Sequence, residues 1–240
     1  LMSALETLFF LFKNFKSGYT NEAKNYRLIS IVPVIGEIIE KVLFNPLSDF
    51  AENFILINKQ YGFRRGRSTT HVVQDLVDTI IKGFDSKRFV GGVLCDLAKA
   101  FDCVSPTILL QKLEKLDPSK LDIQVLDSYL SSRYQVTFFN GKFSEKERVQ
   151  HGVPQGSILG PLLFLQFINH LPYHMKNFKT ILYADDTTFS SNNINDLMIL
   201  MEESQSRAFD WFAVNKGKLN MTKTSKVVFS TYLRSTYRKV

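Results

Sequence analysis

The sequence predicts a mixed α/β fold whose central sheet is partly antiparallel. Three observations indicate it. Short runs of β-branched and aromatic residues are interspersed with longer apolar patterns at helical spacing. Their order lacks the regular strand–helix–strand rhythm of a parallel sheet. The chain has 240 residues, 45% of them hydrophobic, so it is long and apolar enough to bury a core.

The first half of the chain is predicted to be mainly helical. Apolar residues recur at helical spacing over 35–43 and over 72–81. "FVGGVLC" (89–95) is short and apolar and is typical of a buried strand. A helix is then predicted from Ser105, the N-cap, and Pro106, its first residue. Helical segments are therefore expected to fill the first 85 residues and the 105–171 stretch.

The second half is predicted to alternate hairpins and helices. An Asn-Gly pair within 133–150 predicts a hairpin with a polar second strand. The apolar stretch 157–171 predicts a buried helix with Pro161 near its start. "ILYADDTTFS" (181–190) predicts strand, turn and strand, and a longer helix and a last strand at 226–230 follow.

Composition excludes few functions. The net charge of +7 permits a polyanionic partner such as nucleic acid without demanding one. Cys95 and Cys103 form no C-x-x-C pair and are interpreted as small buried hydrophobes in a reducing compartment. The four histidines have no metal-ligand spacing. The apolar start of the chain is too short to span a bilayer and lacks the features of a signal peptide.

Three aspartates are candidates for a metal site. Asp96 emerges directly from the strand at 89–95, and Asp185 and Asp186 lie at the tip of the second hairpin. If the two elements are neighbours in one sheet, three carboxylates converge, and Lys99 alone cannot balance them. Hard oxygen ligands suit Mg²⁺ or Mn²⁺, and two such ions serve in-line phosphoryl transfer. Taken alone, however, an Asp-Asp pair in a turn is more often solvated.

Several motifs, in order along residues 10–230, resemble the reverse transcriptases of non-LTR retrotransposons, closest to jockey- and CR1-like elements. They are "NYRLISIV" (25–32), "QYGFRRGRSTT" (60–70), "LCDLAKAFD" (94–102), "GVPQGSILGPLLF" (152–164), "YADD" (183–186) and "LNMTKTSKVVFS" (219–230). Each is modest alone, and their common register makes the resemblance specific.

The resemblance implies a right-hand polymerase whose palm sheet, mixed or antiparallel, is flanked by helices. The fingers are expected at about 10–88 and 105–165, and the palm at about 89–104 and 166–232. The chain begins with Leu and ends soon after the last expected strand. It is therefore expected to be a single-domain fragment that lacks the thumb and endonuclease regions of a full-length protein.

The resemblance also implies the site. Asp96, Asp185 and Asp186, with the backbone carbonyl of Leu97, would hold two Mg²⁺ ions, with Mn²⁺ as the alternative. Lys223 is the candidate general acid for the leaving pyrophosphate. The implied nucleotide-binding residues are Arg64, Arg65, Arg67, Lys99, Ala100, Phe101 and Gln155.

Two of these assignments compete with plainer ones. A ring at Phe101, five residues after Asp96, would clash with a 2′-hydroxyl and select deoxynucleotides, whereas by composition alone it would be a core residue. The arginines suit phosphate oxygens, or they form a solvated basic turn.

The function implied is RNA-templated DNA synthesis from a primer 3′ end, with an RNA template, a DNA primer and deoxynucleotides as partners and no membrane. A catalytically inactive nucleic-acid-binding remnant and an RNA-directed RNA polymerase are the alternatives. A nuclear or cytoplasmic location is expected, and secretion is not.

Overall fold

The computed structural model describes residues 7–15, 19, 25–116, 120–131, 133–139, 141–191 and 197–230. The chain divides into two compact units, each built from separate segments. The first unit comprises Leu1–Leu56 and Lys99–Asn169, and the second comprises Ile57–Ala98 and His170–Val240. The expected boundaries of fingers and palm stay a prediction; the units divide at other residues and place 57–88 with the strand at 90–95.

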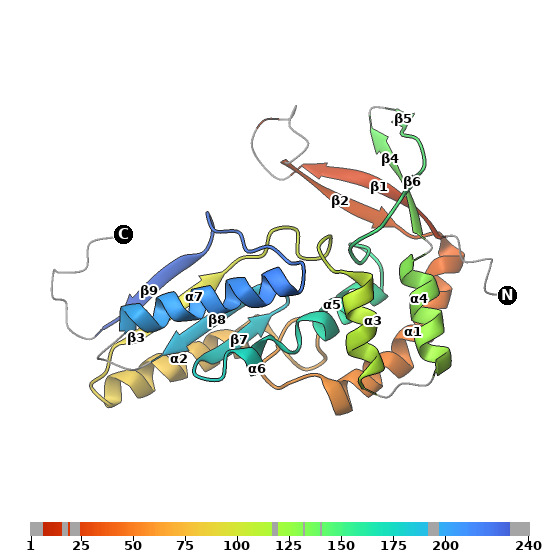
Figure 1. The fold of residues 1–240 in the computed structure, drawn as a ribbon. Coiled ribbons are helices and arrows are strands. Elements are labelled where there is room, and N and C mark those ends of the chain that lie inside the picture. Colours follow the sequence, from red (N-terminus) through yellow and green to blue (C-terminus); the bar gives the residue numbers. More distant parts are fainter. Residues whose placement is uncertain are drawn as a thin grey trace. The chain divides into compact units, whose positions relative to one another are not determined.

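The first unit contains a sheet in the order β2-β1-β4-β5, with β6 also paired to β4 (Figure 1). β1 and β4 run parallel, and the other pairs are antiparallel. Its strands are β1 (Thr7–Phe15), β2 (Tyr26–Ile31), β4 (Arg133–Phe139), β5 (Lys142–Phe143) and β6 (Glu147–Arg148). Its helices are α1 (Val34–Phe50), the π-helical η3 (Ala51–Ile55), α3 (Pro106–Glu114), α4 (Lys120–Ser131) and α5 (Leu159–Ile168).

α5 is the core helix of the first unit. All of its residues except Pro161 are buried, as the mainly apolar sequence predicts. Pro161 is the third residue of the helix, where the backbone N–H would have no partner within the helix, so it is tolerated. α3 and α4 pack together, and α5 contacts both α1 and α3. The predicted helix start at Ser105 and Pro106 is confirmed.

The expectation that helices fill the first 85 residues is wrong for two segments. β1 and β2 are antiparallel strands, paired from Phe10 with Ile31 to Phe15 with Tyr26. The aromatic run of β1 has strand propensity, but it is apolar without alternation, so periodicity does not distinguish it from a helix. Its pairing partners lie elsewhere in the chain, and they decide its conformation.

The second unit contains an antiparallel sheet in the order β7-β8-β3-β9, and helices α2 and α7 pack against it (Figure 1). Its strands are β3 (Val90–Cys95), β7 (Lys179–Tyr183), β8 (Asp186–Ser191) and β9 (Ser225–Phe229). Its helices are α2 (Thr69–Asp85), α6 (Leu171–His174) and α7 (Leu197–Val214). The hairpin predicted at 181–190 is confirmed as β7 and β8, the strand predicted at 89–95 as β3, and the last strand as β9. In the described part of the chain, the helices are too short or too polar to cross a membrane.

Candidate active site

The register of the second sheet brings the two aspartate motifs together. Cys95 of β3 pairs with Thr187 of β8, so the next positions along the two strands are Asp96 and Asp186. Residues opposite each other in an antiparallel pair have Cα atoms about 4.5–5.5 Å apart. Asp185 lies in the turn that joins β7 to β8. This register makes Asp96 and Asp186 neighbours, with Asp185 in the adjoining turn, and their joint binding of a metal stays a prediction.

The Asp96 carboxylate is held by the segment before β9. Asn220 Nδ2 donates a hydrogen bond to Asp96 Oδ2 at 3.1 Å, and the Asn220 backbone N–H donates to the Asp96 carbonyl at 2.8 Å. Lys223 Nζ lies 3.5 Å from Asp96 Oδ2, with the Lys223 side chain 67% exposed. The Lys223 ammonium therefore lies beside the carboxylates, as its candidate role requires.

The three carboxylates influence one another electrostatically. Partial burial raises the pKa of Asp186, and the negative charges of Asp185 and Asp96 raise it further. The positive charge of Lys223 acts in the opposite direction. Among the described residues, no three acidic, imidazole or thiol side chains are placed so that they could hold a metal ion together. The carboxylates are thus adjacent and mutually repelling, which a bound cation would relieve.

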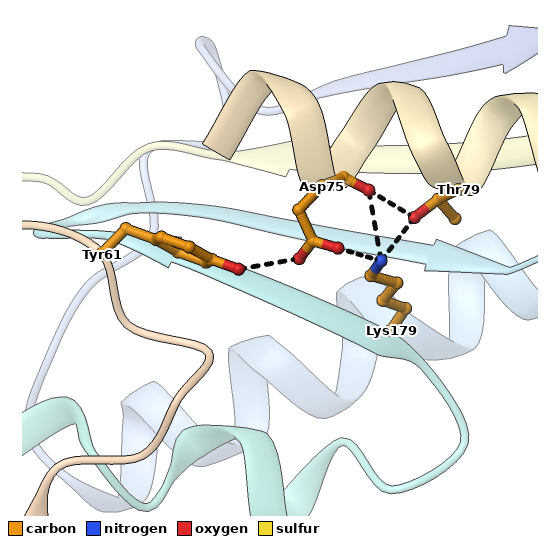
Figure 2. Close-up of polar contacts among 4 residues, drawn as sticks. All are labelled: Tyr61, Asp75, Thr79 and Lys179. Carbon is orange, nitrogen blue, oxygen red and sulfur yellow. Dashed lines mark hydrogen bonds and ion pairs between the residues drawn. The ribbon is translucent and has the colours of Figure 1, made fainter. Parts of the chain in front are cut away.

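The segment 57–67 contains the predicted arginines and is anchored at Tyr61 (Figure 2). The Tyr61 hydroxyl donates to Asp75 Oδ2 of α2 at 3.1 Å. The other oxygen of Asp75 pairs with Lys179 Nζ of β7, which also donates to Thr79 Oγ1 at 2.6 Å. Burial, followed by the Asp75 carboxylate, raises the pKa of Tyr61. We call this segment the arginine segment.

The arginines differ in what they contact. Arg64 Nη1 donates to the Ile57 carbonyl at 2.7 Å, within the arginine segment itself. Arg67 donates to the Asn58 carbonyl at 2.8 Å and to its Oδ1 at 3.0 Å. Arg65 is exposed. Arg64 and Arg67 therefore shape the segment, and a role for all three in phosphate binding stays a prediction.

The remaining predicted nucleotide-binding residues lie in the first unit. Lys99 and Ala100 form the turn that precedes Phe101, and Ala100 is buried. The Phe101 ring stacks on Phe164 of α5, with ring centroids 4.9 Å apart and planes inclined by 22°. Phe101 is half-buried. Its ring is thus packed on one side against the core, and the predicted role in sugar selection stays a prediction.

Gln155 lies in a turn fixed by backbone contacts. Its carbonyl accepts a hydrogen bond from the Ser30 N–H at 2.7 Å, and the Val153 N–H donates to the Phe101 carbonyl at 2.8 Å. Gly156 has φ +115°, and a Cβ there would lie 2.6 Å from the Ser30 carbonyl oxygen, so this position requires glycine. The turn with Gln155 and the segment with Phe101 are therefore held together within one unit.

An open pocket of about 390 Å³ adjoins Gln155 in the first unit. Arg133, Arg148, His151 and Asp102 are among the residues that line it. Arg133 is almost fully buried, and its Nη2 donates to the Gly152 carbonyl at 2.6 Å. The pocket walls near Gln155 thus combine basic groups with polar backbone.

Comparison with known proteins identifies the class. The chain matches the family model described as reverse transcriptase (RNA-dependent DNA polymerase) over residues 15–237. The probable RNA-directed DNA polymerase from transposon BS of Drosophila melanogaster is 34% identical over 226 residues, 90% of this chain and 25% of that protein. The RNA-directed DNA polymerase from mobile element jockey of Drosophila melanogaster is 29% identical over 226 residues, with the same coverage. The chain spans about a quarter of the length of these curated relatives.

Solved structures show the same fold at low sequence identity. Apo telomerase from Candida tropicalis, truncated from the C-terminal domain, matches 88% of this chain and 49% of that chain, with a TM-score of 0.61 and 13% identity. Telomerase from Candida albicans in complex with a TWJ fragment of telomeric RNA matches 97% of this chain and 43% of that chain, with a TM-score of 0.66 and 12% identity.

The fold is that of a right-hand polymerase, with Asp96 at the end of β3, Asp186 at the start of the adjacent β8, and Asp185 in the turn before it. The chain belongs to the reverse transcriptase (RNA-dependent DNA polymerase) family. The resemblance to retrotransposon reverse transcriptases is confirmed by the BS and jockey relatives. Membership supports dependence on divalent metal ions in general.

Two residues at the site were missed by sequence reasoning. Asn220 binds Asp96, and Gln60 binds the backbone of the turn that precedes Asp185. Both are single polar residues whose partners lie more than a hundred positions away, so no local pattern indicates them. The resemblance offered the available signal, because both residues lie within its motifs.

Proposed function

We propose that this chain catalyses RNA-templated DNA synthesis, adding deoxynucleotides to a primer 3′ end by two-metal phosphoryl transfer. The observation that supports it best is the pairing of β3 with β8, which makes Asp96 and Asp186 neighbours beside Asp185. Family membership supplies the reaction type, and the carboxylates supply the chemistry that the reaction needs.

The metal ions are proposed to be Mg²⁺, with Mn²⁺ as a substitute. The donors fit these ions, because carboxylate and carbonyl oxygens are the hard ligands that they prefer. Asp96, Asp185, Asp186 and the Leu97 carbonyl would hold them. When bound, the two ions supply activation of the primer hydroxyl and neutralisation of the leaving pyrophosphate. Partial burial and, after it, the charges of Asp185 and Asp96 raise the pKa of Asp186, and a divalent cation would relieve the repulsion between these carboxylates.

Lys223 is proposed to serve the leaving group. Its ammonium lies 3.5 Å from Asp96 Oδ2 and is largely exposed, so it can turn from the carboxylate toward a pyrophosphate oxygen. An ammonium donates a proton or a charge-assisted hydrogen bond with little rearrangement. Asn220 keeps Asp96 oriented whether or not Lys223 moves, because it bonds both the side chain and the backbone of Asp96.

The nucleotide is proposed to be bound by the residues that the family resemblance implies. The exposed Arg65, with Arg64 and Arg67, would contact the triphosphate. Phe101, with the neighbouring Lys99 and Ala100, would contact the sugar and phosphates. Packing of the Phe101 ring on Phe164 restricts its rotation, which a residue that excludes a 2′-hydroxyl needs. Gln155 would contact the incoming nucleotide and the template.

The partners proposed are an RNA template, a DNA primer and deoxynucleotides. The jockey and BS relatives are described as RNA-directed DNA polymerases, and one structural neighbour was solved with an RNA fragment. The net charge of +7 favours binding to a polyanion. We assign the β3, β7, β8 and β9 sheet to the palm and the arginine segment to the fingers.

Primer extension tests the proposal. The chain is incubated with oligo(dT)-primed RNA, Mg²⁺ and labelled dTTP, beside an Asp186→Asn variant. Extension by the chain and its loss in the variant are expected, and chelation of the metal should abolish it. Salt-sensitive RNA binding without extension would instead identify a non-catalytic nucleic-acid-binding protein.

The same assay tests sugar selection. UTP is expected not to replace dTTP, and Phe101→Ala is expected to admit UTP because the ring that excludes the 2′-hydroxyl is gone. Efficient use of UTP by the unaltered chain would contradict the role of Phe101 and favour an RNA-directed RNA polymerase. Replacing Mg²⁺ with Mn²⁺ tests whether Mn²⁺ can substitute, and primer extension is expected with each ion.

A further inference from the structure

The buried side chain of Gln60 joins the arginine segment to the turn before Asp185. Gln60 is 1% exposed. Its Oε1 accepts hydrogen bonds from the Gly62 N–H at 2.8 Å and from the Ala184 N–H at 3.0 Å. Its Nε2 donates to the Ala184 carbonyl at 3.4 Å. One amide thus binds both polar backbone groups of Ala184, a residue that is itself 5% exposed.

Ala184 has an unfavourable backbone conformation. Its φ is +55°, in the left-handed region, where a Cβ approaches the following carbonyl oxygen. Ala184 directly precedes Asp185 and Asp186, so its φ sets the direction of the turn that carries both carboxylates. If the bonds to Gln60 were lost, Ala184 would favour other regions of φ, and the two aspartates would be displaced with it.

The main chain supports the same contact. The Tyr61 N–H donates to the Leu182 carbonyl at 2.8 Å, and the Leu182 N–H donates to the Lys59 carbonyl at 2.9 Å. The arginine segment therefore runs beside β7 as one parallel bridge, between Gln60 and Leu182. The Gln60 side chain extends this pairing two residues further, to the turn itself.

We propose that Gln60 is a positioning residue: it holds Ala184 in its left-handed conformation and so aligns Asp185 and Asp186 with Asp96 for metal binding. The proposal rests on the proposed function, and it adds a residue that acts through the turn rather than on the substrate. Gln60 also transmits the position of the arginine segment to the carboxylates, because one oxygen atom binds both Gly62 and Ala184.

Three variants isolate this role. Gln60→Leu removes all the side-chain bonds at similar volume. Ala184→Gly removes the cost of the left-handed conformation, so in the Gln60→Leu background it should restore the turn. The matched control is Gln166→Leu, because Gln166 is also buried, lies in α5 of the first unit, and has an Oε1 without a hydrogen-bond partner within the described residues.

Mn²⁺ binding is measured by electron paramagnetic resonance on the 240-residue chain, and amide exchange is measured at Ala184 and Gly62. Gln60→Leu is expected to raise the Kd for Mn²⁺ by about tenfold or more, as loss of a group that orients metal ligands typically does. Exchange at both amides should accelerate. Gln166→Leu should leave both readouts unchanged, and adding Ala184→Gly should recover most of the lost Mn²⁺ affinity.

Several results would overturn the proposal. They are a Kd within about twofold of wild type in Gln60→Leu, an equal loss in Gln166→Leu, no recovery with Ala184→Gly, or a wild-type chain that binds no Mn²⁺. If Gln60→Leu does not fold, Gln60→Met replaces it, since Met also removes every side-chain hydrogen bond at similar volume; a Kd for Mn²⁺ within about twofold of wild type in that folded variant would also overturn the proposal. These readouts need no primer extension, so they remain decisive if the polymerase assay fails.

Discussion

Gly62→Ala should disrupt the contact between the arginine segment and the turn at Ala184. A Cβ at Gly62 would lie 2.2 Å from the Ala184 backbone N, 2.9 Å from its Cα and 3.0 Å from its Cβ. The nearest obstacles are backbone atoms, so no side chain can rotate away. The arginine segment and the turn at Ala184 must therefore separate by about 1 Å to reach ordinary contact distances. The bonds from Tyr61 N–H to the Leu182 carbonyl and from Ala184 N–H to Gln60 Oε1 then exceed hydrogen-bond length.

The expected cost follows from these losses. Overpacking costs about 1–3 kcal/mol, and each lost hydrogen bond adds about 1 kcal/mol. We expect a destabilisation of about 3 kcal/mol, which for a domain of this size lowers the melting temperature by about 6–12 °C. The variant should also lose Mn²⁺ affinity, because Ala184 directly precedes Asp185.

Thermal unfolding by circular dichroism measures the effect, and Gly92→Ala is the matched control. A Cβ at Gly92, in the middle of β3, would meet its nearest atoms at 3.9–4.0 Å, which is ordinary contact. This control is expected to melt within a few degrees of wild type. A Gly62→Ala variant that melts and binds Mn²⁺ like wild type would refute the reasoning, because the segment and the turn could not then be in the contact described.

Three other predictions concern buried groups. The Glu40 carboxylate accepts hydrogen bonds from the Tyr129 hydroxyl at 2.8 Å and from the Ile158 N–H at 2.6 Å. Glu40→Gln turns an NH₂ group toward one of these donors, so it should lower the free energy of unfolding by about 1–3 kcal/mol. Urea unfolding measures this, and an unchanged midpoint would contradict it. Burial lowers the pKa of Lys112 from 10.5 to about 8, so the folded chain binds fewer protons and stability should rise between pH 8 and 10.5. Lys112→Met should remove that rise in urea titrations at two pH values. Burial raises the pKa of the Cys95 thiol to about 12, so at pH 8 a thiol reagent should modify Cys95 after unfolding and not before. Mass spectrometry of the labelled peptides measures this, and labelling of Cys95 in the folded chain would contradict its burial.

Local pattern was sufficient to predict the elements of the second sheet. Asp96 and the Asp185–Asp186 pair stand out because each interrupts an apolar, strand-forming run. An ionised group there costs free energy unless it is solvated or paired with a cation. What the pattern could not establish is that β3 and β8 pair in a register that makes Asp96 and Asp186 neighbours. That depends on contacts between distant segments, and the family resemblance supplied it.

The first 56 residues were harder to predict. β1 fell within the first 85 residues, which were expected to be helical, and its continuous apolar run fits a helix or a buried strand equally well. Gln60 and Asn220 were missed for a different reason. The sequence does not distinguish a buried amide side chain from an exposed one. The roles of these two amides follow from their hydrogen-bond partners, which only the structure locates.

The central place of β3 in its sheet has a consequence for how the protein is made. β3 pairs on one side with β8 and on the other with β9, and both strands are translated long after it. Non-local pairing of this kind slows folding and leaves strand edges open in the meantime. Asp96 leaves the ribosome before the other three residues, acquires Asp186 as a neighbour once residues 186–191 have emerged, and acquires Asn220 and Lys223 still later. The site is therefore assembled only after Lys223 has been synthesised, and a nascent chain that stops before β9 retains β3 as an exposed edge open to pairing with another chain.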